Sequence, residues 1–208
     1  MSPRARVLFA IATLLAVLAF VLPLWNVYLH APQYPEGLGM RIWVSTVTGM
    51  TPNDLNSINN LNHYIGMKRI VPEAIPELRF MPYVLGGLVA LGLVIAWHGS
   101  RRLARVWIAA FLVLAIASLA DFWKWEYDYG HDLDMENAII KVPGMNYQPP
   151  LIGSKQLLNF RATSLPGAGA IVLGMSLTLG VLALLSDRSA KRVKAGARAR
   201  AGAPALAA

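Results

Sequence analysis

VLFAIATLLAVLAFVLPL, residues Val7–Leu24, is an apolar stretch of 18 residues without a charged side chain. Its length is close to the roughly 20 residues that an α-helix needs to cross a hydrocarbon core of about 30 Å. Arg4 and Arg6 precede it, as basic residues precede a signal peptide. However, the stretch is longer than a typical apolar signal segment, and PLWNVY replaces a small-residue cleavage site. We therefore expect an uncleaved membrane anchor.

Three further apolar stretches, 81–97, 106–120 and 167–185, give four predicted spans. The stretch 106–120 is the shortest, and the aromatic residues that follow it suit headgroup depth. Hydrophobic residues make up 56% of the chain and charged residues only 14%, which is unusual for a soluble domain of 208 residues. The sequence thus predicts an all-α membrane protein, with a four-transmembrane-helix bundle in residues 1–188.

The basic residues indicate the orientation of this bundle. If the N-terminus is cytoplasmic, the inner side carries 11 basic residues and one acidic residue, Asp187, a balance of +10. The outer side then carries 8 basic and 10 acidic residues, a balance of −2. Because Lys and Arg accumulate on the cytoplasmic side, we expect both termini inside, in a bacterial inner membrane. The tail 189–208 is rich in Ala, Arg and Gly, so we expect it to be disordered and to face anionic lipid headgroups, not nucleic acid.

The two segments between spans on the outer side, 26–79 and 121–165, are too long for simple connectors. In the first, an N-terminal capping pattern at Thr51–Asp54 and apolar residues at helical spacing predict an amphipathic helix from Pro52 to about Tyr64. In the second, KQLLNFR, residues 155–161, resembles a short interfacial helix. Both segments contain apolar residues that neither can bury alone. We therefore expect two ordered extracytoplasmic loops that pack together as a cap.

His63 and Met67 lie four residues apart near the end of the predicted amphipathic helix. They would share a face if that helix continued through Gly66. An imidazole with a thioether is a soft ligand pair that suits Cu(I). The alternative is that His63 makes a hydrogen bond within a folded loop while Met67 packs. The chain contains no cysteine, which excludes disulfides, zinc-thiolate sites and thiol nucleophiles within it.

Several unusual phrases occur together: NHYIGM in the first loop, then YDYGHDLD, IKVPGMNYQPPLIG and KQLLNF in the second. Over about residues 30–170 this combination resembles a family of small multi-span membrane proteins associated with nitrous oxide reductase gene clusters. The resemblance implies an inner-membrane accessory protein that faces the periplasm, near copper-site assembly or electron supply. It directs attention to four candidate soft-metal ligands in the loops: His63, Met67, His131 and Met145. It implies no catalytic residue.

The leading interpretation is a non-enzymatic accessory protein whose outer loops dock a periplasmic or membrane partner or handle copper. A structural subunit of a membrane complex, without metal, is the nearest alternative. A small transporter or channel subunit is less favoured, because the span interiors carry no charged residue and the halves show no repeat. An enzyme or haem protein is disfavoured too. His30 and His98 fall at or beyond opposite membrane faces, and no nucleophile or phosphate-loop motif is present.

Overall fold

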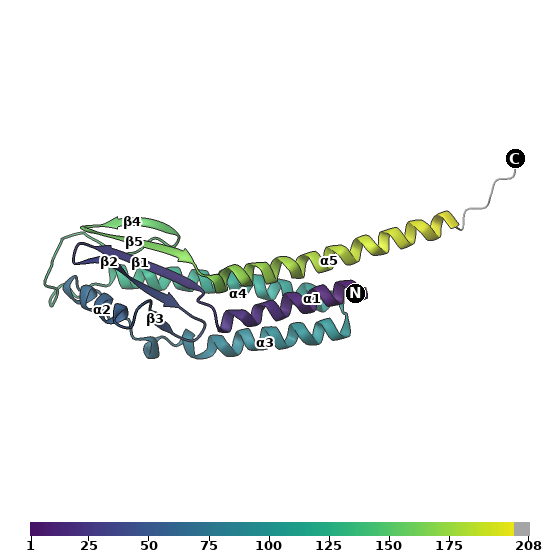
Figure 1. Cartoon of the computed structure of the whole chain (residues 1–208), viewed down its shortest axis with the longest axis horizontal. Helices are drawn as coiled ribbons and strands as arrows, with labels where there is room; N and C mark the ends of the chain where they lie inside the picture. Colours follow the sequence, from purple (N-terminus) through teal and green to yellow (C-terminus); the bar gives the residue numbers. More distant parts are fainter. Residues whose placement is uncertain (202–208) are drawn as a thin grey trace.

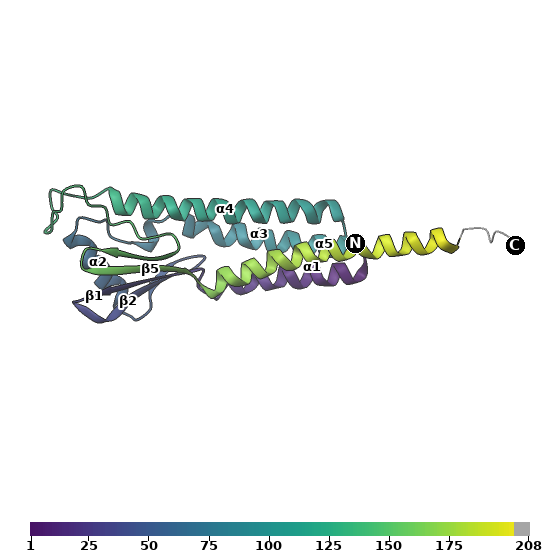
Figure 2. The same cartoon turned by 90° about the horizontal axis from the view of Figure 1, so that it is seen from above.

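The structure contains four long apolar helices and a five-stranded antiparallel sheet (Figures 1 and 2). The computed structural model describes the backbone of residues 1–201 and the side chains of residues 1–187. Within that part, four helices are long and apolar enough to cross a membrane, which agrees with a membrane protein. They are α1 (Pro3–Leu15) with its 3-10 extension η1 (Ala16–Phe20), α3 (Glu77–His98), α4 (Arg101–His131) and α5 (Ala168–Ala201).

The long helices lie side by side: α1 contacts α3 and α5, and α4 contacts the same two helices. A single indole links three of them. The ring of Trp107 in α4 lies edge-on to Phe9 of α1, with centroids 5.0 Å apart, and its Nε1 donates to the Leu88 carbonyl of α3 at 2.7 Å. A Cβ on Gly92 would lie 2.6 Å from Thr13, so glycine is required where α3 crosses α1. This close packing forms the apolar core between the helices.

The strands come from both segments that the sequence places between spans. The sheet order is β3-β2-β1-β5-β4, with every pair antiparallel. The strands are β1 (Trp25–Ala31), β2 (Tyr34–Ile42), β3 (Val47–Gly49), β4 (Gly153–Leu157) and β5 (Phe160–Pro166). Because β1 pairs with β5, the two segments form one unit at one end of the helices (Figure 1). We call residues 25–76 and 121–166 the sheet domain.

The prediction of an all-α protein is therefore wrong. The sequence predicts a helix for KQLLNFR, residues 155–161, but this segment forms the end of β4, the turn after it and the start of β5. Leu158 turns the chain there with a positive φ of 52°. The adjacent apolar residues Leu157 and Leu158 resemble part of a helical face in the sequence. The strand conformation of β5 depends on its pairing with β1. This is a long-range contact, which the spacing of neighbouring residues does not reveal.

Helix α2 (Asp54–Tyr64) confirms the amphipathic helix expected from Pro52 to Tyr64. Asp54 fixes its start, because its carboxylate accepts the Thr51 hydroxyl and the backbone N–H groups of Thr51 at 3.1 Å and Gly39 at 3.0 Å. The Gly39 bond joins α2 to β2. The apolar face of α2 is turned inward, with Ile58 buried and Leu55 and Leu61 half-buried.

Helix α4 extends well past the predicted span 106–120, and the start of the second loop at Asp121 is helical. At about 1.5 Å per residue, Arg101–Ala120 covers about 30 Å, which is enough to cross a membrane. Residues 121–131 continue into the sheet domain. There Phe122 lies 5.4 Å from the Trp25 ring, and the Tyr129 hydroxyl donates to the Arg69 carbonyl at 3.1 Å. The aromatic residues expected as an interfacial belt thus also hold the sheet domain.

Helix α5 follows β5 almost directly, and its backbone is helical to Ala201. Two glycines of this junction, Gly167 and Gly169, pack against residues 22–24, which follow η1. The N–H of Gly169 donates to the Pro23 carbonyl at 2.8 Å, and a Cβ on Gly169 would lie 2.7 Å from the Leu22 carbonyl. Side chains from residue 188 onward and all of residues 202–208 lie outside the described residues, so the disordered tail expected over 189–208 stays a prediction.

Candidate functional site

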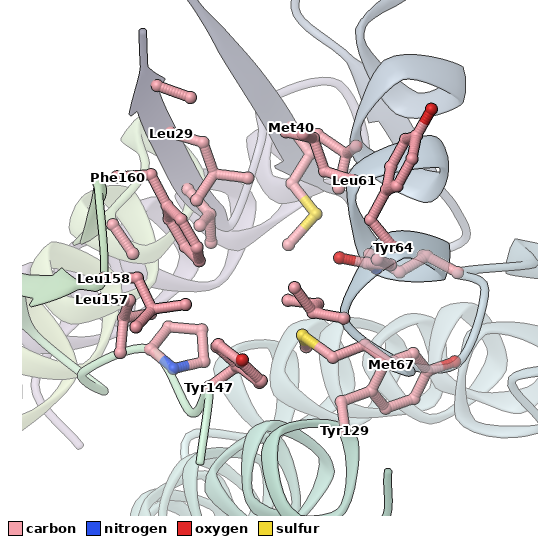
Figure 3. Close-up of a pocket in the computed structure, with 18 of the residues that line it drawn as sticks. Leu29, Met40, Leu61, Tyr64, Met67, Tyr129, Tyr147, Leu157, Leu158 and Phe160 are labelled. Atoms are coloured by element: carbon pink, nitrogen blue, oxygen red, sulfur yellow. The ribbon is translucent and has the colours of Figure 1, made fainter. Parts of the chain in front are cut away.

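A cavity of about 510 Å³ lies inside the sheet domain, between the sheet, α2 and the last turns of α4 (Figure 3). This volume is within the range of about 300–1,000 Å³ that small-molecule sites occupy. We call it the sheet cavity. Its walls are mainly aliphatic and aromatic, so its interior favours apolar groups.

The first wall is one face of the sheet. Side chains alternate between the two faces of a strand, so every second residue of β1 and β5 points toward α2. Val27 and Leu29 of β1 and Ala162 of β5 lie on this face, and Leu29 faces Ala162 across the strand pair. Leu157 and Phe160 close the wall at the β4–β5 hairpin (Figure 3).

The second wall is α2 and the turn that follows it. Leu61 and Met67 point into the cavity from this side (Figure 3). The turn depends on Gly66, whose φ is +77°, and a Cβ there would lie 2.7 Å from the Asp134 carbonyl oxygen. The N–H of Asp134 donates to the Gly66 carbonyl at 2.8 Å. A hydrogen bond of 2.8 Å from Ile140 N–H to the Tyr64 carbonyl continues this contact, so residues 134–140 close the cavity along α2.

The third wall is the end of α4, and it contains a buried carboxyl group. Glu126 is 2% exposed, and neither of its carboxyl oxygens has a hydrogen-bond partner among the described residues. Residues 121–131 lie beyond the predicted span, within the sheet domain. Burial in this apolar environment raises the pKa of the Glu126 carboxyl to about 8. The group is therefore largely protonated at neutral pH, and it can both donate and accept a hydrogen bond.

Tyr147 supplies a second unpartnered polar group. Its side chain is 2% exposed, its hydroxyl has no partner among the described residues, and burial raises the pKa of its phenol. The Tyr147 N–H donates to the Gly130 carbonyl at 2.9 Å. Gly130 lies four residues after Glu126 and hence on the same face of α4. A Cβ on Gly130 would collide with the backbone of Gln148, so glycine lets the segment around Tyr147 lie directly on that face.

A smaller cavity of about 380 Å³ lies next to the first, where the sheet domain meets the long helices. We call it the helix cavity. Leu78 and Met81 of α3, Phe111 of α4 and Leu173 of α5 are among its lining residues. Trp125 lines both cavities, so its indole forms a wall common to the two.

The four candidate copper ligands are in different environments. Met67 lines the sheet cavity, whereas His63 and His131 are exposed and Met145 is half-buried. Helix α2 ends at Tyr64 and the chain turns at Gly66, so His63 and Met67 do not share a helical face. The His131 ring stacks on Tyr127 with centroids 3.9 Å apart, and its Nδ1 lies 3.0 Å from the Tyr127 carbonyl oxygen.

The structure does place segments from both loops next to each other near these residues, since Lys68 forms an ion pair with Asp132. Among the described side chains, no group of three or more His, Cys, Asp and Glu residues could hold a metal ion. The predicted copper site also uses the thioethers of Met67 and Met145, which are not members of such groups. The copper site of His63, Met67, His131 and Met145 therefore stays a prediction.

Glu126 and Tyr147 were not singled out in the sequence as site residues, although a signal for Glu126 exists. Phe122, Trp125, Glu126 and Tyr129 follow the spacing of one helical face, so Glu126 is a lone acid in an aromatic stripe. This stripe can be recognised only if the helix is known to continue past residue 120, as α4 does. No such local signal marks Tyr147. No protein-family model matches this chain, and no curated protein has significant similarity to it.

Proposed function

We propose that this chain is a non-enzymatic accessory protein of the bacterial inner membrane, whose sheet domain docks a protein partner in the periplasm. The observation that carries the proposal is the way in which the sheet domain is joined to the helices. Strand β1 follows η1, and β5 leads into α5. The domain is continuous with all four long helices, through η1, α3, α4 and α5, and a docking platform at the membrane surface requires such an attachment.

The charges at the other end of the helices support the orientation. There Arg101 pairs with the buried carboxylate of Asp187, which also accepts the Ser2 N–H at 2.6 Å. Arg6 donates to the Ala96 carbonyl at 2.9 Å, at the C-terminal end of α3. This end, opposite the sheet domain in Figure 1, is the basic one. Under the positive-inside rule it is cytoplasmic, so the sheet domain is periplasmic.

The sheet face turned away from α2 is the proposed docking surface. Nine of the residues that strand alternation places on it make up what we call the arginine face: Asn26, Tyr28, His30, Arg41, Ser154, Gln156, Arg161, Thr163 and Leu165. His30, Gln156 and Arg161 are neighbours across three strands, and all three are exposed.

The charge of the arginine face selects the type of partner. The face contains two arginines, Arg41 and Arg161, and none of its nine members is acidic. Arg offers a planar fork of donors that binds carboxylates in a bidentate way, which makes it common at interfaces. The partner surface that this face fits is therefore acidic.

The resemblance described above supplies the proposed partner: nitrous oxide reductase, during copper-site maturation or electron supply. The loops carry imidazole and thioether groups, and copper handling at His63, Met67, His131 and Met145 would suit that role. Docking does not depend on copper, so the two parts of the proposal are tested separately.

The docking test measures binding of the full chain, in lipid nanodiscs, to purified nitrous oxide reductase at low and moderate salt. Arg161→Glu should weaken binding by about tenfold, because a charge at the interface is reversed. Arg69→Glu is the matched control. Arg69 is exposed but lies after α2, away from the arginine face, so its reversal should change binding by less than about twofold. Equal losses in both variants, or no binding by the unaltered chain, would contradict the proposal.

A further inference from the structure

We propose that the sheet cavity binds a neutral, lipid-soluble molecule whose polar end is a carbonyl or hydroxyl group, held by the Glu126 carboxyl and the Tyr147 hydroxyl. This inference goes beyond docking and does not rest on it. It depends on the geometry of the cavity, on two buried polar groups without partners and on the position of the cavity beside the helix ends.

Unpartnered polar groups are the first ground. A buried hydroxyl or carboxyl that lacks a hydrogen bond destabilises the folded protein, so such groups are normally satisfied by protein, water or ligand. Glu126 and Tyr147 are each 2% exposed and both lack a partner among the described residues. They also line the same cavity. A ligand oxygen within hydrogen-bonding distance of either group would satisfy that group.

The chemistry of the walls defines the ligand head. Among the described residues that line the sheet cavity, Glu126 is the only acid or base, and the other titratable groups are Tyr34, Tyr64, Tyr129 and Tyr147. The described residues that line it include no lysine, arginine or histidine, so an anionic head such as a phosphate or carboxylate would find no counter-charge among them. A protonated carboxyl and a phenol each donate and accept one hydrogen bond, which complements a carbonyl or a hydroxyl group.

A cationic head is the main competitor, because a carboxylate among aromatic rings suits an amine. Such a ligand would require the ionised form of Glu126. The apolar surroundings oppose that ionisation, since they provide no hydrogen bond to either carboxyl oxygen. The neutral head is therefore favoured, and the amine becomes an outcome of the test.

The helix cavity provides the place for the apolar part of the ligand. It lies between α3, α4 and α5 at the end of the helices that carries the sheet domain, and it shares Trp125 with the sheet cavity. With the Trp125 side chain moved aside, a molecule dissolved in the membrane would lie with its apolar chain among the helices and its head beside Glu126. Movement of the Trp125 side chain would join the two spaces.

The test uses three photoreactive probes with the same twelve-carbon, diazirine-bearing chain and different heads: an alcohol, a carboxylate and a primary amine. The full chain in phosphatidylcholine nanodiscs is irradiated with each probe, and the labelled peptides are mapped by mass spectrometry. The alcohol should label the segments that line the sheet cavity, 58–70 and 157–162, and the carboxylate and amine should do so at least about tenfold less. Labelling confined to the spanning helices, or stronger labelling by the amine, would overturn the proposal.

Variants separate the roles of the polar groups. Glu126→Gln keeps a neutral donor and acceptor, so alcohol labelling in the cavity should persist. Glu126→Leu and Tyr147→Phe should each reduce that labelling several-fold, because a hydrogen bond is lost. Tyr127→Phe is the control for Tyr147→Phe, since Tyr127 is 43% exposed and does not line the cavity. Loss of alcohol labelling in Glu126→Gln would show that the ionised carboxylate is needed and would overturn the neutral assignment.

A variant that fills the sheet cavity tests ligand binding without changing Glu126. Leu61→Trp projects a larger side chain from α2 into the sheet cavity, where Leu61 is half-buried (Figure 3). If Glu126→Leu does not fold, as judged by its unfolding midpoint, Leu61→Trp still decides the matter. It should abolish alcohol labelling at 157–162 while labelling of the spanning helices continues. Unchanged labelling at 157–162 would contradict a ligand in the cavity.

Discussion

Tyr147 donates its backbone N–H to the carbonyl oxygen of Gly130 at 2.9 Å, one helical turn after Glu126 on the same face of α4. This contact brings the second loop back onto the helix from which it emerges. It places the buried phenol of Tyr147 in the same cavity as the buried carboxyl of Glu126. The absence of a side chain at residue 130 is what permits it.

Gly130→Ala should therefore destabilise the sheet domain. The added Cβ would collide with backbone atoms of Gln148, and backbone atoms cannot move aside as the end of a flexible side chain can. We expect a loss of about 1–3 kcal/mol in the free energy of unfolding, as for other overpacked sites. The control is Gly174→Ala in α5, where a Cβ meets nothing within 4 Å. Unfolding midpoints of the detergent-solubilised proteins measure both, and equal midpoints for the two variants would contradict the contact.

Because of Glu126, we expect the free energy of unfolding to depend on pH. Its pKa is raised from 4.5 to about 8 in the folded protein, so folding favours the protonated form. The contribution of this group is fully present below pH 4.5 and is lost as the pH rises toward 8, by at most about 1.4 kcal/mol per pH unit. Glu126→Gln should remove this part of the profile, whereas Glu36→Gln, at an exposed residue of β2, should not. If the free energy of unfolding changed with pH in the same way for the wild type and Glu126→Gln between pH 5 and 8, this would contradict a buried neutral carboxyl at Glu126.

Asp54 should show the opposite pH dependence. Burial raises the pKa of its carboxyl, but hydrogen bonds from Thr51, Gly39 and Met50 together outweigh burial and lower the pKa below 3.8. Its stabilising contribution is therefore present above pH 3.8 and is lost as the pH falls through the lower, folded-state pKa. Asp54→Asn should cost about 1–3 kcal/mol at neutral pH and progressively less in acid. The control Asp128→Asn removes an exposed carboxylate 3.7 Å from Lys124 and should cost less than about 1 kcal/mol.

Copper binding is a separate prediction. Wild-type protein should take Cu(I) from a competing chelator under reducing conditions, and His63→Ala and Met145→Leu should each weaken this uptake, since imidazole and thioether are the soft ligands available. Both residues lie outside the spanning helices, so membrane insertion should not change. His30→Ala is a control for loss of an exposed histidine elsewhere in the domain. If the wild-type protein takes no copper from the chelator, the metal part of the proposal fails.

Much of the helical architecture could be predicted from the sequence, because a spanning helix is encoded locally by a run of apolar residues. Residues 81–97 lie within α3 and residues 106–120 within α4. The helix α2 was also predictable, since Asp54 and the spacing of Leu55, Ile58 and Leu61 are local signals. The end of α4 was not predictable. Charged residues such as Asp121 and Lys124 indicate a loop in the sequence, and only the packing of the sheet domain against this part of α4 explains why it is helical.

The sheet could not be predicted for a different reason. Strand β5 is placed by its pairing with β1, more than a hundred residues earlier in the chain. Contacts of that kind leave little trace in local spacing, and Leu157 and Leu158 suggested a helix instead. The cavity depends on the same pairing, so Tyr147 had no recognisable role in the sequence. Glu126 alone carried a local signal, as an acid within an aromatic helical face.

The most direct test of the account is the side of the membrane on which the sheet domain lies. The chain contains no cysteine, so single cysteines at exposed positions can be labelled without background. Ser154→Cys lies in β4 of the sheet domain, and Arg102→Cys lies at the opposite end, in the first turn of α4. A membrane-impermeant maleimide should label Ser154→Cys in right-side-out vesicles and Arg102→Cys only in inverted vesicles. The reverse pattern would place the sheet domain in the cytoplasm and contradict the proposed periplasmic docking function.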